Sequence, residues 1–169
     1  MASLSLRLAT IWGFARFAAR RREAARKREP LSYIMVDVDH FKHVNDSHGH
    51  ITGDRVLQEI AAVLRTSCRE TDLVGRTGGD EFGVVATATN LSDAVRLAQR
   101  LRAAIDALAL PLEGNVAVKV TLSIGVAVLD PTWASPIDEL MGNADLALYE
   151  AKRSGRNAVR IAKRTSSAA

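Results

Sequence analysis

Two adjacent glycines followed directly by two acids lie between short apolar segments at residues 76–83, which read Arg-Thr-Gly-Gly-Asp-Glu-Phe-Gly. Because glycine adopts positive φ without steric cost, Gly78 and Gly79 between two strand-like segments predict a tight β-hairpin. Asp80 and Glu81 follow the turn. Two interpretations of this pair stay open on these residues alone. They are surface acids on a solvated turn, or they are carboxylate ligands of a divalent cation beside backbone that a ligand can approach closely.

A second group of acids follows the apolar run at residues 33–36, which predicts a buried strand. Alternation along a strand places Asp37 and Asp39 on one face and Val38 on the other. Acids at the end of a central strand, near a second acid pair on a hairpin, are the layout of a two-metal phosphoryl-transfer site. Asp39 has another interpretation, because it precedes a helix predicted from residue 40 and aspartate is a favoured N-cap.

The remaining apolar patterns predict the order β-α-α-β-β-α-β-α-β after an N-terminal helix at about residues 8–27. This order indicates an α+β fold with a central, mostly antiparallel sheet flanked by helices. Gly53 predicts the start of a helix that runs to about Cys68, and Ser92 is the predicted N-cap of the next helix. A β-rich run at 116–129 predicts two segments with a bend near Gly125. Ser135 and Pro136 predict the start of the last helix, Gly155 its end, and residues 157–161 a final strand.

Several motifs in a fixed order resemble the GGDEF domain of diguanylate cyclases from about residue 31 to residue 157. They lie at residues 37–42, 45–50, 53–54, 76–82, 123–126 and 147–157. The resemblance implies the palm-like fold of nucleotide cyclases and polymerases. It also implies an enzyme that condenses two GTP into cyclic di-GMP and releases two pyrophosphates, with two Mg²⁺ or Mn²⁺ ions in each active centre.

The same resemblance implies roles for particular residues. The metal ligands are Asp37, the Val38 carbonyl, Asp80 and Glu81, and the last two are also the catalytic residues, with Asp80 as proton acceptor. The substrate-binding residues are Lys42, Asn45, His50, Asp54, Gly78, Gly79, Lys152 and Arg156. Asn45 and Asp54 read guanine, and the three basic residues contact phosphate. Without the other motifs, ordinary cationic residues at a helix C-terminus would be the better interpretation of Lys152 and Arg156.

Arg69 and Asp72 match the family's RxxD site, at which the product binds and inhibits. Arg100 or Arg102 supplies a second contact to that site, and the sequence does not choose between them. The alternative for Arg69 and Asp72 is a surface salt bridge at a helix end. The reaction needs two GTP molecules face to face, and one chain carries half an active centre. We therefore expect a homodimer, controlled by a sensor or regulatory domain outside this chain.

The positive charge is concentrated at the N-terminus. The chain has 169 residues and a net charge of +4, yet residues 1–30 alone carry eight basic and two acidic side chains. We interpret residues 1–30 as a basic helical arm, 31–162 as the cyclase domain and 163–169 as a disordered tail. A basic arm that binds nucleic acid or anionic membrane is the rival interpretation, but a solvated helix face is the more common use of such a run, and we expect no nucleic-acid partner.

No segment approaches the length of a membrane span, and a single cysteine, Cys68, fits a reducing compartment, so we expect a cytoplasmic protein. Cys68 itself has the pattern of a packing residue. The histidines at 40, 43, 48 and 50 lack the spacing of a zinc cage.

One stretch departs from the family. Residues 6–13 stand where the family usually has an Asp-x-Leu-Thr-Gly-Leu motif, and that motif is absent. An alternative function therefore stays open, in which the chain is an inactive GGDEF module that binds GTP or cyclic di-GMP as a regulator.

Overall fold

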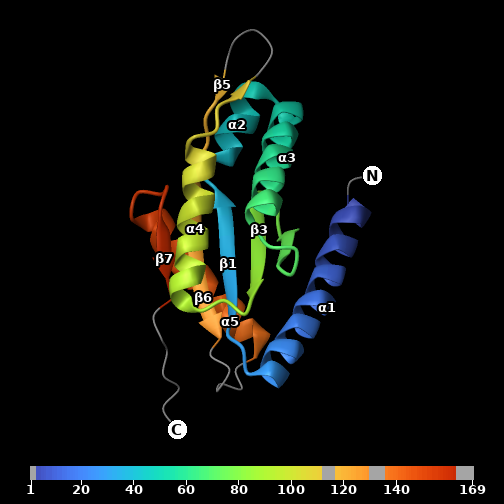
Figure 1. Ribbon diagram of the computed structural model, residues 1–169. Coiled ribbons are helices and arrows are strands. Elements are labelled where there is room, and N and C mark those ends of the chain that lie inside the picture. The colour runs from blue at the N-terminus through green and yellow to red at the C-terminus, as the bar shows by residue number, and fades with distance from the viewer. Residues whose placement is uncertain (1–2, 112–116, 130–135, 163–169) are drawn as a thin grey trace.

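The computed structural model describes residues 3–111, 117–129 and 136–162, and within them the core element is a five-stranded sheet in the order β2-β3-β1-β6-β7 (Figure 1). Each neighbouring pair in this sheet is antiparallel except β6 and β7. The predicted α+β fold with a mostly antiparallel sheet is therefore confirmed. The strands are β1 (Leu31–Val38), β2 (Leu73–Arg76), β3 (Glu81–Thr87), β6 (Leu122–Leu129) and β7 (Val159–Ile161).

Helices cover both faces of the sheet (Figure 1). One apolar core forms where α2, α3 and α4 pack on the sheet, and a second forms beneath α1 and α5. Alternate residues of β1 enter the two cores, with Ile34 and Val36 on the first side and Leu31 and Tyr33 on the second. The helices are α1 (Ser3–Lys27), α2 (Phe41–His48), α3 (His50–Ser67), α4 (Leu91–Asp106) and α5 (Ile137–Arg153).

The N-terminal helix packs on the second core through an aromatic stack. The ring of Phe17 stacks on the ring of Tyr33 with centroids 5.3 Å apart. Ala24 is also buried there. Burial raises the pKa of Tyr33 to about 12, so its hydroxyl stays neutral at physiological pH. Elsewhere on this helix Ala18 is half-buried, whereas the side chains of Ile11 and Phe14 lie outside the described residues.

The β-rich run at 116–129 contains two segments as predicted, but they do not divide at Gly125. The run breaks between β5 (Ala117–Val118) and β6, and β5 pairs with β4 (Leu110–Pro111) in a small second sheet that the sequence did not predict. Gly125 does not bend the strand. It lies in the middle of β6, where a Cβ would overlap the backbone of Ala144 and Leu148 in α5. The glycine permits this close approach of helix to strand.

Several helix ends differ from their predictions by a few residues. α4 is capped by Asn90, whose side chain accepts a hydrogen bond from the Asp93 amide at 3.0 Å, and not by Ser92. α3 begins at His50, before Gly53. Pro136 takes the N-cap position of α5, while Ser135 and the predicted tail at 163–169 lie outside the described residues. Among the described helices, none combines the length and the apolar character needed to cross a bilayer.

We predict that Gly125→Ala destabilises the fold by about 1–3 kcal/mol, because the added methyl group meets helix backbone that cannot move aside alone. The matched control is Gly142→Ala in α5, where an added Cβ meets no atom within 4 Å. The control should stabilise the protein by about 0.5–1 kcal/mol through helix propensity. Urea denaturation of the two variants measures both changes, and equal unfolding free energies would show that α5 does not press on Gly125.

Candidate active site

The predicted hairpin connects β2 and β3, and its tip is held by backbone and arginine contacts. The Thr77 amide donates to the Glu81 carbonyl at 2.9 Å. The Nε of Arg76 donates to the carbonyl oxygens of Gly78 and Gly79 at 3.2 and 3.0 Å. Arg76 was not among the residues predicted for the site. It belongs to the motif in the sequence, but its role as a clamp on the turn depends on a side-chain direction that the sequence does not reveal.

The hairpin brings its acids to the end of β1. Asp37 lies directly opposite Glu81 in the antiparallel register, so the two side chains leave the same face of the sheet. The Val38 amide donates to the Asp80 carbonyl at 3.1 Å, which holds Asp80 beside the same strand end. Burial raises the pKa of Asp37, and the negative charges of Asp80 and Glu81 raise it further. Carboxylates that repel one another in this way favour a bound cation.

Lys152, in the last turn of α5, supplies a positive charge at this place. Its Nζ lies 2.6 Å from Oδ2 of Asp37, and this contact acts against the effect of burial on the pKa of Asp37. The end of α5 is therefore tied to Asp37, which together with Asp80 and Glu81 we call the acid group. Arg156, four residues later, is exposed in the turn after α5 and has a φ of 64°. The structure thus joins Lys152 to Asp37 and does not join Arg156 to either.

A cavity of about 370 Å³ lies beside the hairpin and collects most of the predicted substrate-binding residues. Its lining comes from α2, α3 and the hairpin tip, and includes Lys42, Asn45, His50, Asp54, Gly79 and Asp80, together with Phe41, Leu57 and Arg76. Gly53 lets α2 and α3 meet here, because a Cβ at that position would overlap the side-chain oxygen of Asn45. The cavity has polar groups that can read a base edge and a carboxylate at its mouth.

The donor chemistry around Asp37 fits a divalent cation such as Mg²⁺, which prefers carboxylate and carbonyl oxygens. Asp37, Asp80 and Glu81 supply three carboxylates, and Val38 supplies a backbone carbonyl. In the part of the chain that the structure describes, no three acid, histidine or cysteine side chains are already gathered as a metal cluster. Lys152 neutralises Asp37 in this arrangement.

Asp39 does not act as the predicted helix cap. The N-cap of α2 is His40, and it makes no side-chain capping bond. The Asp39 carboxylate turns away from that helix and accepts hydrogen bonds from Thr121, Ser123 and the amide of Asn157. The capping interpretation considered propensity alone, and three donors distant in sequence outcompete one helix terminus.

The predicted product-binding pair lies at the other end of β2. Asp72 accepts hydrogen bonds from the backbone amides of Arg69 at 2.9 Å and Thr87 at 3.2 Å, so its carboxylate shapes the turn that presents Arg69. Of the two arginines left open, Arg100 donates to the Ser67 carbonyl at 2.7 Å, close to this turn. Arg102 instead donates to Asn157. Arg100 is therefore the better placed of the two for a contact shared with Arg69.

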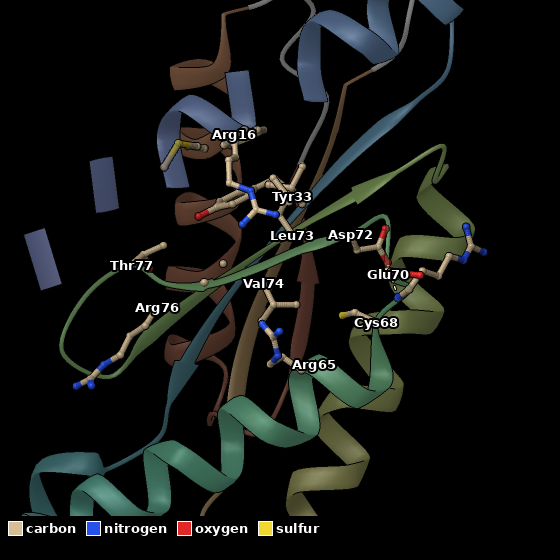
Figure 2. Close-up of a pocket in the computed structure, with 16 residues that line it drawn as sticks. Arg16, Tyr33, Arg65, Cys68, Glu70, Asp72, Leu73, Val74, Arg76 and Thr77 are labelled. Atoms are coloured by element: carbon tan, nitrogen blue, oxygen red, sulfur yellow. Dashed lines mark hydrogen bonds between the residues drawn. The ribbon is translucent and has the colours of Figure 1, made fainter. Parts of the chain in front are cut away.

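Arg69 and Asp72 line a larger cavity of about 800 Å³ along β2. Figure 2 shows Arg16 of α1 extending over Tyr33 towards Leu73, with Asp72, Glu70 and Cys68 at one end and Arg76 and Thr77 at the other. Burial raises the pKa of Cys68 to about 11, so this thiol is protonated and inert, as a packing role requires.

Comparison with known proteins decides the family. The family model described as "Diguanylate cyclase, GGDEF domain" matches residues 13–158. This chain is a member of the GGDEF diguanylate cyclase family. The match begins upstream of residue 31 and so includes much of α1.

Individual GGDEF proteins agree with this assignment. Diguanylate cyclase A of Treponema denticola is 39% identical over 137 residues, which cover 81% of this chain and 36% of that protein. The GGDEF domain of DgcB from Caulobacter crescentus, solved with c-di-GMP, has a TM-score of 0.83 at 29% identity and covers 89% of this chain and 88% of that one. The active GGEEF domain of a diguanylate cyclase from Vibrio cholerae has a TM-score of 0.81 at 35% identity, with 89% and 94% covered. The chain spans about a third of the length of the curated relatives, 36% and 29% for two of them.

We predict that Gly53→Ala weakens GTP binding by about tenfold, because the new methyl group displaces Asn45 from the GGDEF domain's small cavity. The fold should survive, since the obstructing group is the end of a flexible side chain. The matched control is Gly75→Ala on β2, where a Cβ meets nothing within 4 Å. Calorimetric titration with GTP measures the effect. Equal affinities of the two variants would place the nucleotide elsewhere.

Proposed function

We propose that this chain is a diguanylate cyclase, which condenses two GTP into cyclic di-GMP and two pyrophosphates. One observation carries the proposal: strand pairing brings the backbone positions of Asp37, Asp80 and Glu81 together at one end of the sheet, beside a cavity lined by Asn45 and Asp54. The family relationship supports the same reaction.

The cavity holds the guanine base. Asp54 accepts from the N1–H and N2–H groups of guanine, which adenine does not offer in that arrangement, and Asn45 completes the contact to the base edge. His50 lines the same cavity, and Lys42 at its wall faces the phosphates. Lys152 and Arg156 add positive charge for the triphosphate from the end of α5. Gly78 and Gly79 let the nucleotide pass close to the hairpin backbone.

In the reaction, the 3′-hydroxyl of one GTP attacks the α-phosphorus of the other, and the bond to pyrophosphate breaks. Asp80 accepts the proton of the attacking hydroxyl, with Glu81 beside it. Divalent metal held by Asp37, the Val38 carbonyl, Asp80 and Glu81 would neutralise phosphate charge and make the attacking hydroxyl more acidic. Lys152 then exchanges part of its contact with Asp37 for contact with phosphate.

One chain supplies one base pocket and one acid group, whereas the reaction joins two nucleotides. Two chains must therefore meet with their hairpins opposed, in a two-fold homodimer bridged by substrate. We further infer that a sensor or regulatory domain controls this encounter in the whole protein, because the chain matches about a third of its curated relatives.

The deciding experiment incubates the purified chain with GTP and Mg²⁺ and identifies the product by mass spectrometry. We predict cyclic di-GMP, with specific activity rising over the micromolar range of enzyme as dimers form. Asp80→Ala and Glu81→Ala should each lower the rate by about 100-fold or more with the fold retained, because the reaction loses its proton acceptor and metal ligands. Glu59→Ala, on the exposed face of α3, is the control for loss of one surface acid. Near-normal turnover in either hairpin variant would refute the acid assignment.

An inactive module that binds GTP or cyclic di-GMP is the second candidate, favoured by the unusual stretch at residues 6–13. The same experiment separates the two functions, because a module of this kind binds GTP yet yields neither pyrophosphate nor cyclic di-GMP.

We also propose product inhibition at Arg69 and Asp72, with Arg100 as the further contact. Arginine suits bidentate contact with guanine edges and phosphate. We predict that Arg69→Ala relieves inhibition by added cyclic di-GMP and leaves the initial rate unchanged, because Arg69 lies at the far end of β2 from the acids. Arg96→Ala, an exposed arginine of α4, serves as the control. Inhibition of the same strength in Arg69→Ala and in the control would disprove the site.

A further inference from the structure

The buried carboxylate of Asp39 lies next to Asp37, and the proposed reaction gives it no role. Asp39 is 3% exposed, and both of its oxygens are engaged by hydrogen-bond donors. Oδ1 accepts from the Ser123 hydroxyl at 2.7 Å, and Oδ2 accepts from the Thr121 hydroxyl at 2.6 Å and the Asn157 amide at 3.0 Å. The carboxylate thus joins the end of β1, the start of β6 and the turn after α5. These three donors, and not a lysine as for Asp37, are the partners of this carboxylate.

The turn that Asp39 holds has an unusual backbone. Gly155, Arg156 and Asn157 follow one another with φ values of 105°, 64° and 43°. Positive φ suits glycine and is tolerated by asparagine, but it is unfavourable for arginine and persists only where surrounding contacts impose it. Here those contacts act mainly on Asn157, whose amide donates to Asp39 and whose side-chain oxygen accepts from Arg102 at 2.7 Å.

The position of this turn relates the two halves of the predicted phosphate site. Lys152 lies in the last turn of α5 and its Nζ donates to Asp37, while Arg156 lies in the strained turn that follows the helix. Because Asp37 and Asp39 leave the same strand end two residues apart, one segment of backbone fixes both the acid group and the turn that carries Arg156. A shift of that turn would move Arg156 relative to Lys152 without disturbing the cavity for the base.

We propose that Asp39 is a positioning residue for the nucleotide's triphosphate. It holds the turn at residues 155–157 so that Arg156 and Lys152 act on the same phosphates, and it does so by hydrogen bonds, without touching metal or substrate. The inference rests on the proposed function for the location of the triphosphate, and it adds to that function a residue that decides phosphate affinity separately from base affinity.

The test compares the affinities of GTP and GMP in the full chain, because both carry guanine and only GTP carries the triphosphate. In Asp39→Ala, GTP binding should weaken by about tenfold while GMP binding stays unchanged. Asp39→Asn should retain most of the GTP affinity. Its amide oxygen can replace Oδ2 towards Thr121 and Asn157, and its amide nitrogen can donate to the Ser123 hydroxyl.

The matched control is Thr121→Val, which removes one hydrogen bond to Asp39 and leaves the bond to the Asn157 amide intact. It should bind GTP and GMP like the unaltered chain. If Asp39→Ala does not fold, Arg102→Met carries the test, since it releases the other contact to Asn157 and should lower GTP affinity about threefold with GMP unaffected.

Three results would overturn the inference: equal weakening of GTP and GMP, no weakening of GTP, or an Asp39→Asn variant as defective as Asp39→Ala. The last would show that the negative charge itself is required, as for a metal ligand. Failure of the proposed function gives a different result. A chain that binds GTP but forms no cyclic di-GMP still allows the affinities for GTP and GMP to be measured and compared. In an active enzyme, Asp39→Ala should raise the KM for GTP with a much smaller change in kcat.

Discussion

The pairing of β1 on both of its edges is the constraint on which the rest of the domain depends. Strand β3 pairs along one edge and β6 along the other, and the two faces enter separate apolar cores. A strand enclosed in this way can carry charged side chains only near its ends. Asp37 and Asp39 lie at one of them, and the register with β3 puts Glu81 opposite Asp37. Strand pairing therefore decides where the acid group lies.

Placing Asp37 and Asp39 at a buried strand end has an energetic cost. The raised pKa of Asp37 means that folding disfavours its ionised form, so this group costs stability as pH rises through its folded-state pKa. Lys152 offsets part of the cost by pairing with it. Asp39 avoids it differently, because its carboxylate accepts three hydrogen bonds from fixed donors. Asp37 and Asp39 are thus stabilised in different ways. Asp37 has one mobile lysine partner that it can exchange for another, whereas Asp39 has three fixed hydrogen-bond donors that hold it in place.

Much of the fold followed from local patterns, whereas most residues of the candidate site were predicted from the family resemblance. A continuous apolar run predicted β1, and paired glycines predicted the hairpin. Asn45 and Asp54, which the resemblance grouped together, line one cavity. Features decided by tertiary contacts did not follow. Asn90 and Ser92 are both good caps, and only the surrounding structure selects Asn90. Gly125 is needed because the backbone of α5 packs directly against it, and the sequence of β6 alone does not reveal that contact.

The N-terminal helix shows the same limit. Its charge pattern predicted a basic helical arm, and that pattern does not reveal that Phe17 stacks on Tyr33 or that Ala24 is buried beside it. Removing residues 1–28 would therefore expose a core as well as delete charge. Asp39 had two local interpretations, and its partners proved to be 82, 84 and 118 residues away along the chain. Contacts across such separations lie beyond any argument from neighbouring residues.

The same separations have a consequence for how the domain is made. The hydrogen bond from Asn157 to Asp39 closes a loop of 118 residues, and β6 reaches β1 only after the hairpin and α4 have been synthesised. Long-range closures of this kind slow folding and come late. A chain still emerging from the ribosome can build the hairpin and the base cavity first. The turn that carries Arg156 joins them last, because the bond that holds it to Asp39 needs the last part of the described chain.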